Sequence, residues 1–404
     1  MRQFFSELRN FFRRGDMVLL LLCLGTSAFG CLMIASTTNY MGYVRYVSMQ
    51  ILAILLGVGA YAVVSSIDIK AIAERRTLLV LFNTALLLLL LSPFGTDMST
   101  GNRSWLNFPF LPFNIQPAEF CKITYVIIMA SVMNIYQERV SSLRAVFRMG
   151  VHLVLVAGLN WVVSGDAGVS LIFVFIFLIM AFAGGVKLVW FLLGGGLVVT
   201  AIPFIWEFVM EEYQRRRILV LFDPNIDPLG MNERYQIVRS LRSLNGGGLT
   251  GQGLFSGNRT QKGALVAQHT DMIFSAIGEE MGYLGCILVM IMLILIIIRC
   301  VYVGTKSPDY LRKVLCFGVA GAMIFQTLSN VGMCMGVSPV IGLTLPFISY
   351  GGSSILSMYI MMGLVSGVHA RPTRPIHERY IHAPIGMESK SWKREKNTWE
   401  EPHG

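Results

Sequence analysis

Long apolar stretches separated by short polar ones dominate the chain. A helix needs about 20 apolar residues to cross the hydrocarbon core of a bilayer. Ten stretches come close to or exceed that length: 17–36, 46–66, 77–93, 116–136, 146–165, 167–184, 187–208, 272–299, 313–335 and 348–369. The pattern predicts an all-α polytopic membrane protein with about ten transmembrane helices. The longest polar interruption, 209–271, predicts a large loop between helices 7 and 8.

Positive charge alternates between successive short loops. Lys and Arg gather before the first apolar stretch and after the second, fourth, eighth and tenth, whereas the intervening short loops carry few. Because cytoplasmic loops are enriched in Lys and Arg, this alternation predicts that both termini are cytoplasmic. The loop 209–271 is then extracytoplasmic, since loops of that length largely escape the charge rule. We expect 1–370 to form one membrane domain and 371–404 a flexible basic tail in the cytoplasm.

Composition narrows the class of protein further. Hydrophobic residues make up 54% of the chain and charged residues 14%, whereas soluble domains carry about 25% charged residues. This excludes an ordinary cytosolic enzyme. The net charge of +10 comes from basic residues between the apolar stretches, so it indicates membrane topology, and we expect no nucleic-acid partner. The seven cysteines show no CxxC spacing, which argues against a disulfide framework or a zinc site.

The first candidate site is the segment 101–122, GNRSWLNFPFLPFNIQPAEFCK. Its three prolines break any helix, so it is expected to be a re-entrant or interfacial loop, with Trp105 in the headgroup layer. Glu119 and Lys122 are three residues apart and share one helix face. Two interpretations remain open for them: an ion pair that orients the fourth span, or direct contact with a substrate.

The long loop contains a glycine-rich stretch, NGGGLTGQG at 245–253. Its backbone N–H groups could cradle a phosphate, but a plain flexible loop is the simpler interpretation. The preceding residues 235–244 have apolar positions at helical spacing, which predicts an amphipathic helix lying on the membrane surface.

Asp271 is the last carboxylate before the eighth apolar stretch, and Gln268, His269 and Thr270 precede it. A partly desolvated carboxylate has a raised proton affinity, which suits a general base. The alternative is that Asp271 caps the helix that follows. Glu279 and Glu280 lie deeper in the same stretch, where at least one must find a cation, a hydrogen bond or a proton.

The last feature is PVIGLTLPFISYGGSSILS, 339–357, where prolines and glycines interrupt what should be membrane. Irregular backbone at that depth is tolerated where it lines a cavity or is buried in protein. Ser349, Tyr350 and Ser353 would supply hydrogen-bonding groups to such a cavity. Helix–helix packing through small residues is the alternative.

Together these stretches resemble the SEDS family of polytopic proteins, which includes RodA, FtsW and SpoVE. The matching motifs are GNRSWLNFPFLPFNIQPAEFCK, RRRILVLFDPNIDPLG, GGGLTGQG, QHTDMIFSAIGEEMGYLG and PVIGLTLPFISYGGSS, spread over about 100–355. The overall likeness is nearer to RodA, and roles in elongation, division or sporulation all stay open. Several positions depart from the family pattern: Val266-Ala267 replaces Pro-Glu, Met49 replaces an Arg, and Asp166-Ala167-Gly168 replaces Asp-Leu-Gly.

The resemblance implies a peptidoglycan glycosyltransferase that polymerises lipid II at the outer face of the bacterial cytoplasmic membrane. It implies a class B penicillin-binding protein as the partner that cross-links the product. The essential Asp of the family's QHTD motif corresponds to Asp271, which we expect to be the catalytic base. The substrate-binding residues carried over or expected nearby are Arg103, Trp105, Glu119, Lys122, Arg259, Lys262, Gln268, His269, Thr270, Ser349, Tyr350, Gly351, Gly352 and Ser353.

The residues indicate no definite cofactor, although a divalent cation, Mg²⁺ or Mn²⁺, could share the charge of a pyrophosphate. The sequence offers no dedicated metal cage. The rival function is a lipid II flippase, because ten spans, intramembrane carboxylates and broken helices also suit a transporter. A scaffold that only recruits the penicillin-binding protein is a third possibility. Short, featureless inner loops favour the enzyme over alternating access.

Overall fold

The computed structural model describes residues 15–97, 102–109, 114–232 and 234–371, and the tail predicted at 371–404 lies outside them except for its first residue. Each of the ten predicted stretches is helical in the structure. Eight helices or helical runs are long and apolar enough to cross a membrane, and two, Arg76–Leu91 and Ala167–Ala183, are shorter. The predicted all-α fold is confirmed for the described residues, whose strands are two short ones, β1 (Gly95–Thr96) and β2 (Trp105–Leu106).

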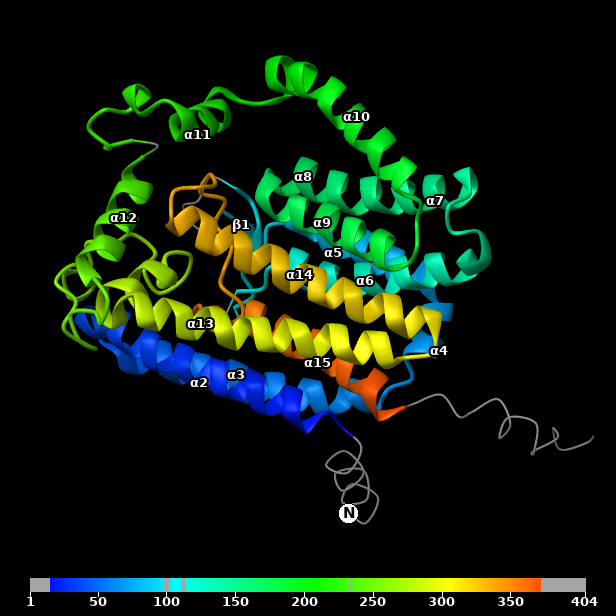
Figure 1. The fold of residues 1–404 in the computed structure, drawn as a ribbon, viewed down its shortest axis with the longest axis horizontal. Coiled ribbons are helices and arrows are strands. Elements are labelled where there is room, and N and C mark those ends of the chain that lie inside the picture. The colour runs from blue at the N-terminus through cyan, green and yellow to red at the C-terminus, as the bar shows by residue number, and fades with distance from the viewer. Residues whose placement is uncertain (1–14, 98–101, 110–113, 233, 372–404) are drawn as a thin grey trace, which may run out of the picture.

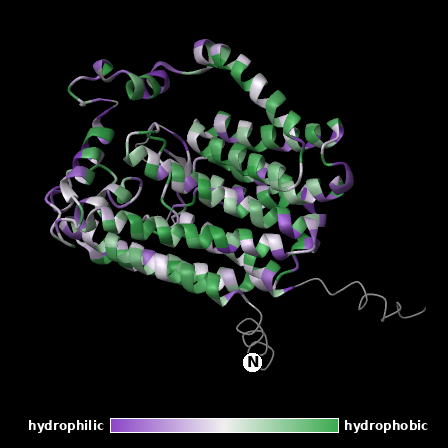
Figure 2. Cartoon of the chain, in the orientation of Figure 1, coloured by the Kyte–Doolittle hydropathy of each residue, from purple (hydrophilic) through white to green (hydrophobic). Residues whose placement is uncertain are grey.

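The helices form one elongated bundle (Figure 1). Its long helices are α2 (Met17–Thr37), α3 (Tyr43–Ser66), α5 (Arg76–Leu88), α6 (Pro117–Ile135), α7 (Leu143–Leu153) continued by α8 (Leu159–Ser164), α9 (Ala167–Ala183), α10 (Leu188–Phe204), α13 (Ile273–Lys306), α14 (Tyr310–Cys334) and α15 (Gly352–Ala370). Short helices α4 (Ile69–Glu74), α11 (Glu212–Phe222) and α12 (Tyr235–Gly247) lie in the connections. Figure 2 shows that apolar residues follow the long helices and that polar ones gather at their ends.

Small residues let the central helices approach closely. A Cβ on Gly363 of α15 would lie 2.9 Å from the Tyr61 carbonyl oxygen of α3. A Cβ on Gly57 of α3 would lie 2.6 Å from the Tyr359 ring of α15. Contact of this kind replaces the hydrophobic driving force that helices lack inside lipid. In contrast, α10 buries none of its described side chains and lies apart from the bundle in Figure 1.

Ion pairs join the helices at the end of the bundle where the described chain begins and ends (Figure 1). The buried Asp16 carboxylate caps α2 by accepting the Leu19 N–H, and it also pairs with Arg299 of α13 at 2.9 Å. Lys70 pairs with Asp309, the N-cap of α14, at 2.5 Å. These basic side chains lie at the end that the charge pattern predicts to be cytoplasmic.

The opposite end, here called the loop end, carries the segments 92–116, 209–272 and 336–351. There α12 packs against α13 instead of lying free on a membrane surface, and it buries Ile237, Ser240 and Ser243. The glycine-rich stretch is not a loose loop either. The N–H groups of Gln252 and Gly253 donate to the carbonyls of Glu279 and Glu280, both at 3.0 Å.

Glycines make this backbone-to-backbone contact possible. A Cβ on Gly247 would lie 1.9 Å from the Gly278 carbonyl oxygen, and one on Gly251 would lie 2.1 Å from the Glu280 carbonyl oxygen. Gly282 interrupts α13 with a φ of 65°, so the residues before it form a separate short helical piece. The N–H groups of Gly251, Gln252 and Gly253, which were candidates for a phosphate cradle, are therefore engaged within the protein.

We predict that Gly247→Ala disrupts the loop end, because its methyl group would overlap the Gly278 carbonyl. The neighbouring variant Gly246→Ala is the matched control, since its Cβ would meet only the flexible Gln252 side chain at 3.2 Å. Thermal unfolding of the detergent-solubilised chain should show a lower midpoint for Gly247→Ala and little change for Gly246→Ala. Equal midpoints for the two variants would contradict this packing.

Candidate active site at the loop end

Asp271 lies on a tight turn directly before α13. The helix begins at Ile273, and its N-cap is Met272, which makes no side-chain cap. Asp271 is therefore not the helix cap that one interpretation of the sequence offered. Its main-chain carbonyl accepts a hydrogen bond from the Asn330 amide of α14 at 2.8 Å. Its carboxylate accepts no hydrogen bond from any residue in the described part of the chain.

The turn that presents Asp271 is held from several sides. Ala267 adopts a positive φ of 53°, which is unusual for a residue with a side chain, and its carbonyl accepts the N–H groups of Thr270 and Met272, both at 3.1 Å. The buried Gln268 amide donates to the carbonyls of Thr37 and Thr260 at 2.6 and 2.9 Å. A strained turn persists only where its surroundings enforce it, so these contacts fix the position of the Asp271 carboxylate.

The SYGGSS segment, 349–354, supports the same turn. Ser349 donates from its hydroxyl to the Thr270 carbonyl at 2.7 Å, and the Tyr350 N–H donates to the His269 carbonyl at 2.8 Å. The rings of His269 and Tyr350 also contact the Tyr46 ring, with centroids 5.3 and 5.4 Å from it. Several predicted site residues thus lie together, and one role of Ser349 and Tyr350 is to hold the turn.

The remaining residues of this motif act through backbone contacts. The Gly351 N–H donates to the Gln50 side chain at 3.2 Å, and Gly352 begins α15. Ser353 donates to the Asn114 carbonyl at 2.7 Å, which ties α15 to the segment before α6.

Burial is the main electrostatic influence on Asp271. It raises the pKa of the carboxyl from 3.8 to about 6, and the negative charge of Asp166 contributes in the same direction. At neutral pH such a group is mostly ionised yet holds a proton more firmly than an ordinary Asp. A general base works best when its pKa lies near the working pH. Burial also lowers the pKa of His269, so this ring is mostly neutral at pH 7.

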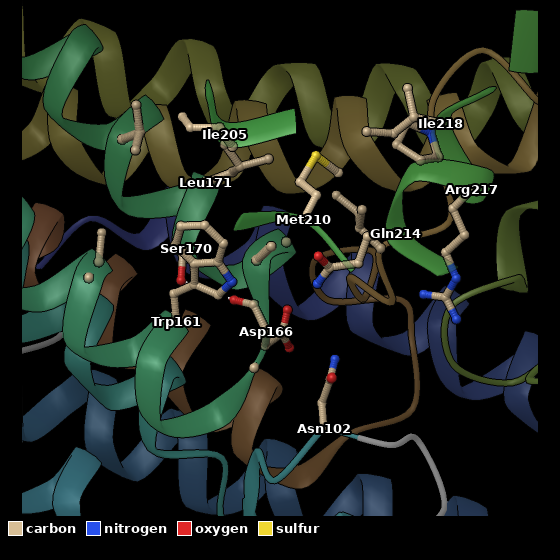
Figure 3. Close-up of a pocket in the computed structure, with 18 of the residues that line it drawn as sticks. Asn102, Trp161, Asp166, Ser170, Leu171, Ile205, Met210, Gln214, Arg217 and Ile218 are labelled. Atoms are coloured by element: carbon tan, nitrogen blue, oxygen red, sulfur yellow. Dashed lines mark hydrogen bonds between the residues drawn. The ribbon is translucent and has the colours of Figure 1, made fainter. Parts of the chain in front are cut away.

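A cavity of about 550 Å³ opens between α8, α9, α11 and the segment 339–341 (Figure 3), and Asp271 is not among the residues that line it. Most of its wall is apolar and comes from residues such as Trp161, Leu171 and Ile205. Its polar lining residues are Asn102, Asp166, Ser170, Gln214 and Arg217. Ile341 lines the cavity, and a Cβ on the next residue, Gly342, would lie 3.6 Å from the Asp271 carboxylate.

The sequence did not single out these cavity residues as a site. Asp166 was noted only as part of a departure from the family pattern, Asn102 and Arg217 lie in matching motifs but were given no role, and Gln214 was not noted at all. The sequence Ser164-Gly165-Asp166 could have pointed to Asp166 as a site residue, because it joins two apolar stretches with almost no linker. A polar group at so short a junction must lie close to both helices.

Glu119 and Lys122 lie away from the cavity. Their side chains are 6% and 0% exposed and pair at 2.8 Å within α6. Ser357 of α15 donates a hydrogen bond to the same Glu119 carboxylate. This geometry favours the interpretation in which the pair orients α6 against α15.

Arg103 and Trp105 belong to the small hairpin. The Arg103 guanidinium donates to the Ser92 carbonyl at 2.8 Å, and Trp105 pairs with Thr96 across the two strands. Of the other predicted cations, Lys262 is exposed, and the main-chain N–H of Arg259 donates to Glu279 at 2.7 Å. The structure does not gather these three cations around Asp271 through any hydrogen bond or ion pair of the described residues.

The carboxylates of Glu279 and Glu280 are both hydrogen-bonded. Glu279 accepts the Thr260 hydroxyl at 2.9 Å, and Glu280 accepts the Gln261 amide at 2.8 Å. Ser36 of α2 also donates to Glu280 at 2.5 Å. These two acids attach the long loop to the bundle. A transport path would instead need carboxylates at the middle of the membrane that are free to bind an ion or a substrate.

Comparison with known proteins agrees with the fold and with the motifs. The model of the FtsW, RodA and SpoVE family, described as cell cycle protein, matches residues 16–374. A probable peptidoglycan glycosyltransferase FtsW of Geobacter metallireducens is 33% identical over 367 residues, 89% of this chain and 95% of the relative. Peptidoglycan glycosyltransferase MrdB of Escherichia coli K12 is 32% identical over 288 residues, 70% of this chain and 75% of the relative.

Solved structures show the same architecture. A chain from a peptidoglycan synthase complex that coordinates polymerization and crosslinking matches with a TM-score of 0.75 and 25% identity, over 89% of this chain and 99% of that one. Rod shape determining protein RodA of Thermus thermophilus matches with a TM-score of 0.66 and 22% identity, over 89% of this chain and 98% of that one.

The helical fold, the family match and these relatives together define a polytopic membrane glycosyltransferase that acts in peptidoglycan synthesis. The chain belongs to the FtsW, RodA and SpoVE family, as its motifs predicted. Relatives of the FtsW type and of the RodA type have nearly equal identity, 33% and 32%, so identity alone does not distinguish a role in division from one in elongation.

A double substitution tests whether Glu119 and Lys122 are structural. Replacing only one partner leaves a buried charge unpaired, which typically costs about 3–5 kcal/mol, whereas replacing both by apolar residues is often neutral. We predict that Glu119→Leu and Lys122→Met each lower the thermal midpoint and the yield of glycan polymer. The double variant should recover both properties. If it folds with a normal midpoint but makes no polymer, the pair contacts substrate.

Proposed function

We propose that this chain polymerises lipid II into glycan strands at the outer face of the cytoplasmic membrane, with Asp271 as the general base. The observation that carries the proposal is the position of Asp271: a desolvated carboxylate without a hydrogen-bond donor among the described residues, on a rigid turn beside an apolar cavity. A base in this setting is available to a hydroxyl group that approaches from the substrate.

The reaction joins two lipid-linked sugars. The 4-hydroxyl oxygen of an incoming lipid II sugar attacks the anomeric carbon of the growing strand and forms the new glycosidic bond. The bond from that carbon to the undecaprenyl pyrophosphate breaks, and the pyrophosphate oxygen keeps the electron pair. The proton of the attacking hydroxyl passes to the Asp271 carboxylate. General-base assistance of this kind contributes about 10²–10⁴ in rate.

The cavity suits the lipid part of such a substrate. Its apolar wall offers a dry surface to a polyprenyl chain, while Gln214 and Arg217 line the α11 side of the cavity, and Figure 3 shows the Gln214 side chain directed towards Asp166. We assign Arg217 to the pyrophosphate, because a guanidinium binds phosphate oxygens through paired N–H groups. Arg103, Arg259 and Lys262 stay candidates for the same role through movement of the loops.

A resident divalent cation fits this site poorly. In the described part of the chain no three acidic, His or Cys residues come together as metal ligands. Asp166 and Asp271 supply only two carboxylates near the cavity, so no step of the mechanism is assigned to a metal. A cation could still arrive bound to the pyrophosphate, which by itself offers the oxygen ligands that Mg²⁺ prefers.

The outward orientation and the partner follow from the same proposal. The loop end is opposite the end with the clustered basic side chains, which is the arrangement that the positive-inside rule predicts for an extracytoplasmic site. We propose that a class B penicillin-binding protein cross-links the product. The synthase complex among the similar structures supports this choice of partner.

Asp271→Asn tests the proposed base directly. Asparagine keeps the size of the side chain but cannot take up the proton, so we predict a loss of polymerisation of about 10²-fold or more. Polymer should be measured from purified lipid II with the partner present. The control is Asp309→Asn, an N-cap at the opposite end of the bundle, which should keep near-normal activity. Normal polymerisation by a correctly folded Asp271→Asn protein would disprove the assignment.

A further inference from the structure

We propose that Asp166 is a positioning residue for the polymerisation reaction: its fixed negative charge acts on Asp271 and makes that carboxylate the stronger base. This inference rests on the proposed role of Asp271 and adds a second carboxylate to it. The motifs gave Asp166 no role, but the structure places it at the wall of the cavity (Figure 3).

Asp166 is held rigidly at the start of α9. Its carboxylate caps the helix by accepting the Val169 N–H at 3.0 Å. Its own N–H donates to the Ser164 hydroxyl at 3.1 Å, and its carbonyl accepts the Ser170 hydroxyl at 3.0 Å. Gly165, with a φ of 71°, ends α8 and reverses the chain in front of it. The charge of Asp166 therefore has a fixed position.

Two glycines bring the two carboxylates to the same turn. A Cβ on Gly168 would lie 2.8 Å from Ile341 and 3.4 Å from the Asp166 carboxylate. A Cβ on Gly342, the residue after Ile341, would lie 3.6 Å from the Asp271 carboxylate. The start of α9 thus packs against residue 341, and Asp271 packs against residue 342.

The surroundings of the two acids differ in a way that decides which one takes the proton. Burial raises the pKa of both carboxyls, but Asp166 accepts N–H groups at the positive end of α9, and these lower its pKa again and favour the ionised form. Asp271 accepts no hydrogen bond at its carboxylate from the described residues. When two nearby carboxylates compete for one proton, the less solvated one holds it. Asp271 is then the base, and Asp166 stays charged.

The pKa of Asp271 reflects burial and the charge of Asp166, with no contribution from a cation. His269 precedes it on the same turn, and burial lowers the pKa of that ring, which leaves it neutral at pH 7. Cys334 of α14 contacts the Asp271 carbonyl through a thiol. From the segment 339–351, Tyr350 contributes a phenol whose pKa is raised by burial. From α12, the Arg239 guanidinium is engaged with the Ala264 carbonyl.

The alternative is a purely structural role, in which Asp166 serves only as a helix cap. Asparagine and serine are both good N-cap residues, so Asp166→Asn and Asp166→Ser remove the charge and keep the cap. Ser142→Ala is the matched control, because it removes a different N-cap, that of α7, without touching the cavity.

The experiment is the pH dependence of polymer synthesis from purified lipid II, using the full chain with its penicillin-binding protein. Wild-type activity should fall as the pH drops through about 6, where Asp271 becomes protonated. In Asp166→Asn and Asp166→Ser, this fall should move to lower pH by about 0.5–1 unit, because the repelling charge is gone. Activity on the neutral plateau should drop about three- to tenfold, because the base is weaker.

Ser142→Ala should leave the pH profile unchanged, even if it lowers the thermal midpoint. An unchanged profile in both charge-free Asp166 variants would overturn the inference and leave Asp166 as a cap. The proposed function fails separately: if Asp271→Asn polymerises normally, Asp271 is not the base, whatever the Asp166 variants do. If Asp271→Asn is inactive while the Asp166 profiles match wild type, only the present inference fails.

Discussion

The contact between the long polar loop and the first residues of α13 is the constraint on which the rest of the loop end depends. A membrane-embedded site needs irregular backbone, and irregular backbone leaves polar groups that lipid cannot satisfy. Here Gly247 and Gly251 allow the loop to touch the α13 backbone directly, and the carboxylates of Glu279 and Glu280 accept hydrogen bonds from the loop. Because this contact fixes the start of α13, it also fixes the turn that carries Asp271.

The proposed function assigns the two parts of the reaction to two surfaces. In this proposal the apolar cavity beside α8 and α9 takes the lipid part of a substrate, and the polar turn presents Asp271 as the group that accepts a proton. The same cost of desolvation serves both purposes. Removing water makes the cavity attractive to a polyprenyl chain, and it raises the proton affinity of a carboxylate at its edge.

The sequence predicted the bundle well because membrane helices can be recognised by their length and hydropathy. The ten predicted stretches coincide with helices, and the motifs predicted the correct family. The sequence predicted the local chemistry less well, because spacing does not show what a side chain contacts. The glycine stretch had the composition of a flexible loop or a phosphate cradle, but its N–H groups bond to Glu279 and Glu280 carbonyls. Asp166 and Arg217 lie beside one cavity only because the fold brings the start of α9 and the helix α11 to the same cavity.

The most direct test of the account is a structure of the full chain with a lipid II analogue that cannot react. The account predicts that the polyprenyl chain occupies the cavity and that the acceptor's 4-hydroxyl oxygen lies within hydrogen-bond distance of the Asp271 carboxylate, about 2.6–3.2 Å. A sugar bound elsewhere, with the Asp271 carboxylate far from any hydroxyl of the analogue, would contradict it.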